Sequence, residues 1–226
     1  MAEQLASCKK GERCGCGACP ICLRRVRCWL SGALYLLLIT LGWTRGQGYA
    51  VSVIPTWLAC QAGHLSVSAL LRAEHRIRKA ISRSVLCDLV IVGGWDFSWN
   101  EDSDGAWGPH WQPHLYLVFL GAVTRAQIER ELKRIFPGSP TTPKPVACEP
   151  LKDPVEVITY AFKACFFRRI GYVRKDNGKR DTRKDLPLRP AQERELLTVL
   201  DQLTITGRLF LRNVRRRGGR LVALSA

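Results

Sequence analysis

Five cysteines near the N-terminus have the spacing of a zinc-binding cluster. Residues 8–22 read CKKGERCGCGACPIC, in which two residues separate Cys19 from Cys22. Thiolates at this separation on a tight turn converge on a tetrahedral zinc ion, and four of them close a structural site. Cys16 is the competing fifth thiol, and the alternative is a set of free cysteines in a disordered tail. The zinc ligands that we predict are Cys8, Cys14, Cys19 and Cys22.

The composition indicates a nucleic-acid partner. The chain has 226 residues, ten cysteines and a formal net charge of +16 at pH 7. Such a cationic excess favours nucleic acid over an anionic membrane surface. The stretch MAEQLASCKKGERCG has no apolar signal core, so we expect a cytoplasmic, reducing compartment in which thiols bind metal or are buried. No glycine-rich phosphate loop is visible, so we expect no small-molecule cofactor.

A two-stranded hairpin is the element around which we expect the fold to be organised. Residues 95–99 alternate bulky and polar side chains, and residues 114–120 are a run of strand-forming apolar residues. The acidic, glycine-containing segment 100–108 connects them. His110 and His114 lie at the start of the second strand, so this hairpin carries two of the four histidines of the chain.

The other elements follow from apolar periodicity and capping signals. Ser66 or Ser68 is expected to cap one helix, and Thr124 to cap another. Residues 29–43 are uncharged, but a membrane span needs about 20 apolar residues. We therefore expect this segment to be a helix buried against the main domain, with a membrane helix as the weaker alternative. Strands are expected over 49–54, 85–92 and 146–149, and helices over 66–83, 124–136, 155–170 and 190–203.

These elements predict an α+β fold with a mostly antiparallel central sheet and helices packed on one side of it. A cysteine-rich zinc element over residues 1–28 comes first, and an apolar helix over 29–45 follows it. The main domain is expected over 46–173. A basic, helical C-terminal extension is expected over 174–226.

The second strand of the hairpin resembles the metal-binding strand of HUH-type single-strand nucleases, which are rolling-circle replication initiators and related transposases. Residues 113–118 read PHLYLV, where that family has His, a bulky apolar residue and His, often after Pro. The resemblance implies that His114 binds a divalent ion, Mg²⁺ or Mn²⁺, that polarises a DNA phosphate. Tyr116 stands at the position of the second histidine, and a neutral phenol is a poor metal ligand.

A second ligand for this ion would have to come from elsewhere. His110 is one candidate, but in a continuous strand its Cα lies about 13 Å from that of His114, so shared coordination requires a turn between them. Asp96, Asn100 and Glu101 on the partner strand are further donors. The alternative is that both histidines are bonded to backbone groups.

The helix expected over 155–170 carries a second family motif. Tyr160-Ala161-Phe162-Lys163 fits the YxxK pattern of the plasmid Rep-like initiators with one catalytic tyrosine. The resemblance implies that Tyr160 attacks the DNA phosphate and stays attached to the 5′ end. Lys163, one helical turn further on the same face, would stabilise the phosphate charge. The alternative is a half-buried helix tyrosine with its lysine in water.

Arginines near both ends of the chain are expected to contact DNA phosphates. A basic run is often only a solvated surface, but the overall charge favours DNA. The arginines concerned are Arg24, Arg25, Arg212, Arg215, Arg216 and Arg217.

The resemblance therefore implies a DNA-nicking and strand-transfer protein of rolling-circle replication or transposition. Its substrate would be single-stranded or hairpin DNA, and its reaction that of a metal-dependent endonuclease and transesterase. The alternative is a catalytically inactive, zinc-containing DNA-binding protein of the same fold, in which Tyr116 marks the lost activity. Tyr160→Phe distinguishes the two, because it should abolish only a covalent DNA adduct.

Overall fold

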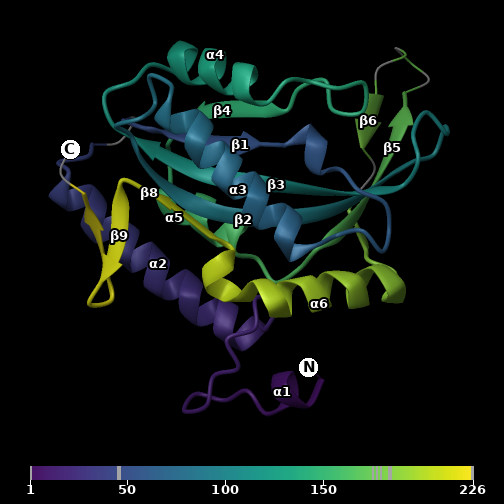
Figure 1. The fold of residues 1–226 in the computed structure, drawn as a ribbon, viewed down its shortest axis with the longest axis horizontal. Coiled ribbons are helices and arrows are strands. Elements are labelled where there is room, and N and C mark those ends of the chain that lie inside the picture. The colour runs from purple at the N-terminus through teal and green to yellow at the C-terminus, as the bar shows by residue number, and fades with distance from the viewer. Residues whose placement is uncertain are drawn as a thin grey trace.

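The computed structural model describes residues 2–44, 47–174, 176, 178, 180–182 and 185–224. It has an α+β architecture in which helices cover both faces of a curled, mixed sheet (Figure 1). The expectation of helices on one side only is wrong, because α2 (Pro20–Thr40) and α5 (Pro154–Ala161) bury a second set of apolar side chains on the opposite face. The strands along the sheet are, in spatial order, β4 (Val146–Pro150), β1 (Tyr49–Val53), β3 (His110–Leu120), β2 (Val90–Asp102), β5 (Phe167–Val173) and β6 (Arg180–Thr182).

Two short strands join this sheet outside that path. β7 (Leu186–Pro187) pairs with β5, and β8 (Leu209–Arg212) pairs with β2. Among the described strands every pairing is antiparallel except that of β2 with β5, which is parallel. A separate hairpin consists of β9 (Val214–Arg217) and β10 (Arg220–Ala223). The expectation of a mostly antiparallel sheet is thus confirmed.

The helices surround the sheet in two groups (Figure 1). α3, α4 and α6 bury their apolar side chains against one face of the sheet, and α2 and α5 bury theirs against the other. Their bounds are α1 (Ala2–Ala6), α2 (Pro20–Thr40), α3 (Val67–Ser82), α4 (Arg125–Ile135), α5 (Pro154–Ala161) and α6 (Pro190–Gly207), and a 3₁₀ turn spans Thr56–Leu58.

The hairpin of β2 and β3 forms the centre of the sheet, and its side chains point alternately to the two faces of the sheet. Trp95, Trp111 and Leu115 point to the face under α3, α4 and α6, where they are fully buried. Residues of the other parity lie on the opposite face. There Val92 and Val118 pack under α2 and α5, and polar side chains follow them along the same two strands. One face is therefore all core, and the other is part core and part polar site.

The predicted helix starts of α3 and α4 are confirmed by their capping bonds. Ser66 accepts a hydrogen bond from the backbone N–H of Ala69 at 3.3 Å. Thr124 and Gln127 form a reciprocal capping box at the start of α4. These local bonds satisfy backbone N–H groups that have no partner within the helix.

The helix expected over 29–45 begins earlier than predicted. α2 starts at Pro20, directly after Cys19, and ends at Thr40, so residues 28 and 29 lie within one helix. Leu30, Leu34 and Leu37 are fully buried, as expected for a helix packed on the main sheet. Among the described residues no helix combines the length and apolarity needed to cross a membrane.

The helix expected over 155–170 is wrong in its second half. α5 ends at Ala161, and the chain re-enters the sheet as β5 at Phe167. Pairing of β5 with β2 supplies the backbone hydrogen bonds that a continued helix would otherwise have made. The strand expected over 85–92 is also shorter than predicted, because β2 begins only at Val90.

The C-terminal extension is helical only in α6, which covers the predicted helix over 190–203. After α6 the chain adds β8 beside β2 and then forms the β9–β10 hairpin, which packs against α2 (Figure 1). The expectation of a wholly helical extension is therefore wrong. Residues 175, 177, 179, 183, 184, 225 and 226 of that extension lie outside the described residues.

Candidate functional site

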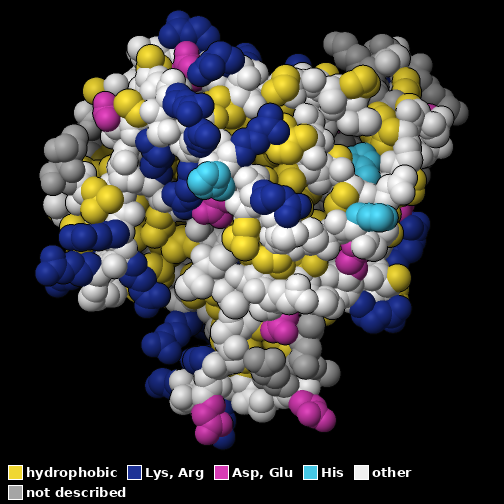
Figure 2. Space-filling view, viewed as in Figure 1, with side chains coloured by type: hydrophobic (Ala, Val, Ile, Leu, Met, Phe, Trp, Pro, Cys, Tyr) yellow, Lys and Arg dark blue, Asp and Glu magenta, His cyan; other side chains and the backbone are white. Residues whose placement is uncertain are grey.

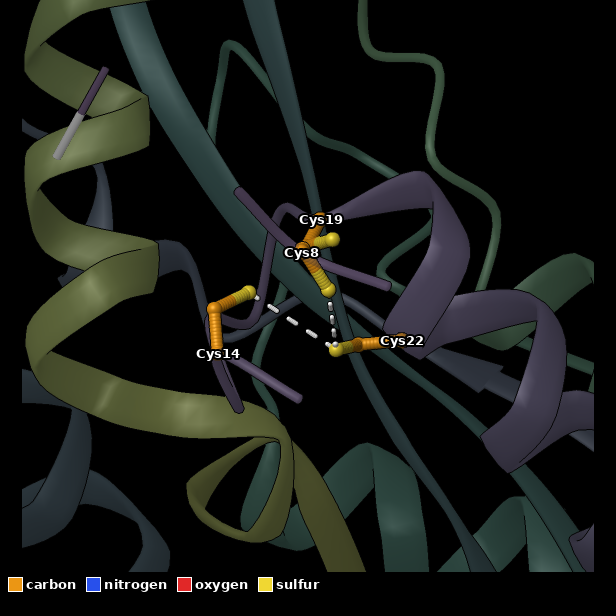
Figure 3. Close-up of side chains that lie close together, drawn as sticks. All are labelled: Cys8, Cys14, Cys19 and Cys22. Atoms are coloured by element: carbon orange, nitrogen blue, oxygen red, sulfur yellow. Dashed lines mark hydrogen bonds between the residues drawn. The ribbon is translucent and has the colours of Figure 1, made fainter. Parts of the chain in front are cut away.

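The four predicted zinc ligands converge in the structure. The Sγ atom of Cys22 lies 3.5 Å from that of Cys8 and 3.7 Å from that of Cys14, and the four sulfurs, including that of Cys19, all lie within 4.8 Å of one another (Figure 3). Four ligands at a Zn–S distance of about 2.3 Å place tetrahedral corners about 3.8 Å apart. The cluster could therefore hold a metal ion.

Cys16, the competing thiol, lies outside this group. Its sulfur accepts a hydrogen bond from the backbone N–H of Ala18 at 3.4 Å. Burial, reinforced by the nearby carboxylate of Asp201, raises the pKa of Cys16. In contrast, a hydrogen bond from the backbone of Cys14 lowers the pKa of Cys8 to about 7. Within the cluster, burial raises the pKa of Cys14 and of Cys22, so Cys8 is the thiol whose ionisation the fold itself favours.

The cluster is held by contacts on both sides of the cysteine loop. Cys19 is the N-cap of α2 and Pro20 its first residue, so the helix start fixes the last two ligands. On the other side, the N–H of Gly17 donates to the carbonyl of Leu200 in α6 at 3.1 Å. A Cβ at Gly17 would lie 2.6 Å from that same carbonyl oxygen, so the close approach requires glycine.

A second site lies on the polar half of the sheet face under α5, and Asp96 is at its centre. Asp96 is fully buried, and its Oδ2 lies 2.7 Å from the Nζ of Lys163 and 3.1 Å from the Nε2 of His114. Burial raises the pKa of Asp96, but the hydrogen bond and charge of His114 together with the charge of Lys163 outweigh it, and the pKa lies below its ordinary value. Asp96 is therefore a buried carboxylate.

Tyr160 sits beside this carboxylate at the end of α5. The Nζ of Lys163 lies 4.2 Å from the centroid of its ring, and the Nη2 of Arg169 lies 3.4 Å from its hydroxyl oxygen. Burial raises the pKa of Tyr160, but its hydrogen bond with Tyr116 and the two cations outweigh this effect, so the pKa is lowered. Tyr160 as a whole residue is 39% exposed, and it lines a cavity on this face of the sheet.

Tyr116 links the two halves of this site. Its ring meets that of Tyr160 edge-on at 4.5 Å and that of His114 at 5.1 Å. Burial and the neighbouring Tyr160 raise its pKa well above the ordinary value for tyrosine. Tyr116 is thus a protonated phenol whose hydroxyl supports Tyr160.

Two cavities meet at Tyr116 and Ser52. One, of about 340 Å³, is lined by His110, His114, Tyr116 and Arg169. The other, of about 400 Å³, is lined by Tyr116 and Tyr160 and has an acidic rim. Because they share these two residues, the cavities adjoin as one groove, and Tyr160 lines its second part.

His110 does not join His114. β3 is continuous from His110 onward, and the cross-strand partners of the two histidines are Asn100 and Asp96, respectively. The turn that shared metal coordination requires is therefore not formed, and the Nδ1 of His110 lies 2.9 Å from the carbonyl oxygen of Gly108. Within the part of the chain that the structure describes, the four cysteines are the only group of three or more His, Cys, Asp or Glu ligands that converges.

Glu101 and Asn100, the other donors considered, have separate surroundings. The carboxylate of Glu101 is bound by Arg168 at 3.1 Å and by Arg189 at 2.6 Å. Asn100 lines the first cavity and pairs across the hairpin with His110.

Arg208 is a central residue that the sequence did not single out. It is fully buried and donates to the carbonyls of Gly17 (2.7 Å), Ala161 (3.1 Å) and Trp95 (3.3 Å). Burial lowers its pKa to about 10. One guanidinium thus connects the cysteine loop, β2 and the end of α5, and in the sequence it was one basic residue among many near the C-terminus.

The arginines expected to contact DNA divide into two kinds. Arg24, Arg25 and Arg215 are exposed on α2 and the β9–β10 hairpin, as are Arg216 and Arg217. The guanidinium of Arg216 lies 4.7 Å above the ring of Trp29. Arg212 is half-buried and donates to the carbonyl of Cys87 at 3.0 Å, so its contact is structural.

Comparison with protein-family models, curated proteins and solved structures gives no match. The function is therefore argued from the chemistry of the two sites and from the distribution of charge.

Proposed function

We propose that the protein nicks single-stranded or hairpin DNA and transfers the strand through a covalent tyrosine–DNA intermediate, in rolling-circle replication or transposition. Tyr160 is the nucleophile. The observation that carries the proposal is the surroundings of this residue: it is partly exposed, the pKa of its hydroxyl is lowered, Arg169 contacts the hydroxyl and Lys163 lies over the ring. A nucleophile for phosphoryl transfer needs such activation and such cations.

The proposed step is an in-line displacement at one phosphodiester. The phenolate oxygen of Tyr160 bonds to phosphorus, and the bond from phosphorus to the 3′ oxygen breaks. The leaving oxygen takes a proton from water and becomes a free 3′ hydroxyl, and the 5′ phosphate stays on the tyrosine. Lys163 and Arg169 stabilise the charge that develops on the phosphate oxygens. Attack by another 3′ hydroxyl reverses the step and completes strand transfer.

The residues of this site do not fit the Mg²⁺ or Mn²⁺ ion that the resemblance to initiators implies. His114 and Lys163 both approach the Oδ2 of Asp96, so an ammonium group already neutralises the buried carboxylate. No third ligand among the described His, Cys, Asp and Glu residues joins them. In the proposed reaction Lys163 and Arg169 therefore stabilise the phosphate charge, and no step uses a divalent ion.

The cysteine cluster fits a structural zinc ion. Four sulfur ligands at tetrahedral spacing leave no open coordination position, which is typical of a structural rather than a catalytic metal. Bound zinc would fix the loop that contacts α6 and, through Gly17, Arg208. Its proposed role is to stabilise the fold around the nuclease site.

A second candidate function is DNA binding without catalysis on the same fold. The presence of Tyr116 in place of an imidazole, together with the neutralised Asp96, favours it. In this case Tyr160 would only line the groove.

The experiment that distinguishes the two mixes the full-length protein with labelled single-stranded oligonucleotides from the DNA next to its own gene. A protein–DNA adduct that survives denaturation is expected with the wild type. Tyr160→Phe should abolish the adduct and leave DNA affinity unchanged. Tyr35→Phe is the matched control, because Tyr35 is 60% exposed on α2, away from the site. Salt-dependent binding without any adduct would instead favour the binding protein.

A further inference from the structure

Two helices on the same face of the sheet carry their positive charge in different ways. In α4 each basic side chain pairs with a carboxylate of the same helix: Arg125 and Lys133 pair with Glu129 at 2.7 Å and 3.2 Å, and Arg130 and Arg134 pair with Glu131 at 3.6 Å and 3.1 Å. This is an ordinary solvated surface laced with ion pairs.

α3 shows the opposite pattern. Arg72, Arg76, Lys79 and Arg83, the last at its C-cap, are exposed at intervals of four, three and four residues, which places them on one side of the helix. None of them forms an ion pair with a described residue. The acidic residue of α3, Glu74, pairs with Arg78 at 2.7 Å. The stripe formed by Arg72, Arg76, Lys79 and Arg83 therefore has no carboxylate on α3 to balance its charge.

The stripe is also held in place. The guanidinium of Arg76 lies 4.6 Å from the ring centroid of Trp57, which itself stacks on Phe136 at 5.5 Å. Figure 2 shows Lys and Arg side chains gathered over this face of the molecule, which is turned toward the viewer together with α3 and α4. The sheet separates this face from Tyr160, because α3 and α5 pack on opposite sides of it.

The length of the stripe suits a nucleic-acid duplex. At a rise of about 1.5 Å per residue, Arg72 and Arg83 are about 16 Å apart along the helix axis. The major groove of B-DNA is about 12 Å wide, so cations at the two ends of the stripe reach phosphates on both strands.

The other exposed residues of α3 argue against different partners. They are Ser68, Leu71, His75 and Ser82. A single-strand site needs exposed Trp, Tyr or Phe on which bases stack; α3 itself carries none, and the neighbouring Trp57 is half-buried and already stacked on Phe136 and covered by Arg76. A membrane-bound helix needs an apolar face, and Leu71 is a single exposed apolar residue. We propose that α3 binds the phosphate backbone of duplex DNA, independently of the nicking reaction proposed for Tyr160.

The test compares two variants with the same change in charge. In the first, Arg72, Arg76, Lys79 and Arg83 are replaced by Gln; in the second, Arg125, Arg130, Lys133 and Arg134 on α4 are replaced by Gln. Affinity for a short labelled duplex is measured by fluorescence anisotropy between about 50 and 200 mM salt, because each phosphate contact contributes about 0.9 to the slope of log affinity against log salt.

The α3 variant should lower this slope by about 3.6 and weaken duplex binding by roughly two orders of magnitude at the low-salt end, and each single substitution should lower the slope by about 0.9. The α4 variant should lower the slope by less than about 0.9, the value expected for one phosphate contact. Equal losses in the two variants would overturn the proposal, as would an α3-dependent affinity for anionic vesicles with no effect on the duplex.

Circular dichroism and thermal unfolding establish that both variants fold. The adduct assay on single-stranded DNA, repeated with the α3 variant, separates this proposal from the nicking reaction. An adduct that persists while duplex affinity is lost supports both proposals. A wild type that forms no adduct but binds duplex through α3 rejects only the nicking reaction.

Discussion

The cysteine cluster and the Asp96 site differ in how their charges are balanced. In the cluster four similar groups face one another, and burial raises the pKa of Cys14 to about 12. Burial also raises the pKa of Cys22, so these two thiols ionise readily only when positive charge is brought in from outside, as a metal ion does. Asp96 is instead approached by His114 and Lys163 from the chain itself. The cysteine cluster lacks a balancing cation until an ion binds, whereas the chain itself supplies the cation that balances Asp96, although the Oδ1 of Asp96 has no hydrogen-bond partner among the described residues.

The largest effect that follows from this contrast is on metal removal. A chelator, or Cys19→Ser, should unfold the N-terminal loop and lower the free energy of unfolding by several kcal/mol, because the free energy of metal binding to such sites is about 10–16 kcal/mol in zinc-finger peptides. Metal content and thermal unfolding measure this. Cys28→Ser is the control, since Cys28 is an exposed free thiol outside the cluster. Equal stability with and without chelator would contradict the contrast.

The second largest effect on stability should come from removing the charge of Asp96. Asp96→Asn leaves the ammonium of Lys163 without its partner in a largely buried position, and breaking a buried pair in this way costs about 3–5 kcal/mol. Urea unfolding at neutral pH measures the loss. Glu12→Gln, which breaks an exposed pair with Lys9, should change stability little. Similar losses of unfolding free energy in the two variants would show that the ion pair of Asp96 with Lys163 does not stabilise the fold.

The pH dependence of stability should test the same interaction of Asp96 with His114 and Lys163. Because the pKa of Asp96 is lower in the folded protein than its ordinary value of about 3.9, its contribution to stability is present above that value and is lost as the pH falls through the folded pKa. Unfolding free energies between neutral pH and pH 3 should therefore fall more steeply in the wild type than in Asp96→Asn. Parallel pH profiles would argue against a depressed pKa.

The smallest expected effect is on the ionisation of Tyr160. Lys163→Met removes a cation that lowers the pKa of this phenol, so the pKa should rise. The difference in phenolate absorbance between each protein and its Tyr160→Phe counterpart isolates this one titration. An unchanged Tyr160 titration in Lys163→Met would indicate that Tyr116 and Arg169 account for the shift.

Features that depend on residues close together in the sequence could be predicted from it. The four cysteines lie within one short segment, and the caps Ser66 and Thr124 act on their own first turns, so spacing was sufficient. The central hairpin was also predicted, because its two strands are joined by a short connection.

Features decided by distant pairing could not be predicted in this way. Phe167 begins a strand because β2 lies beside it, although an apolar segment of that kind fits a helix equally well. β8 is a strand for the same reason. Arg208 is buried only because three carbonyls from remote segments meet around it, and no local pattern marks that position.

The position of β8 also constrains how the protein can be made. Leu209 to Arg212 pair with Ile91 to Gly94, so one neighbour of the central strand is supplied by a segment far along the chain. A ribosome must synthesise the chain beyond Arg212 before this pairing and the Arg208 contacts can form. Until then the first part of β2 has an unpaired edge that other nascent chains can join. The protein should therefore depend on chaperones during synthesis more than its size alone suggests.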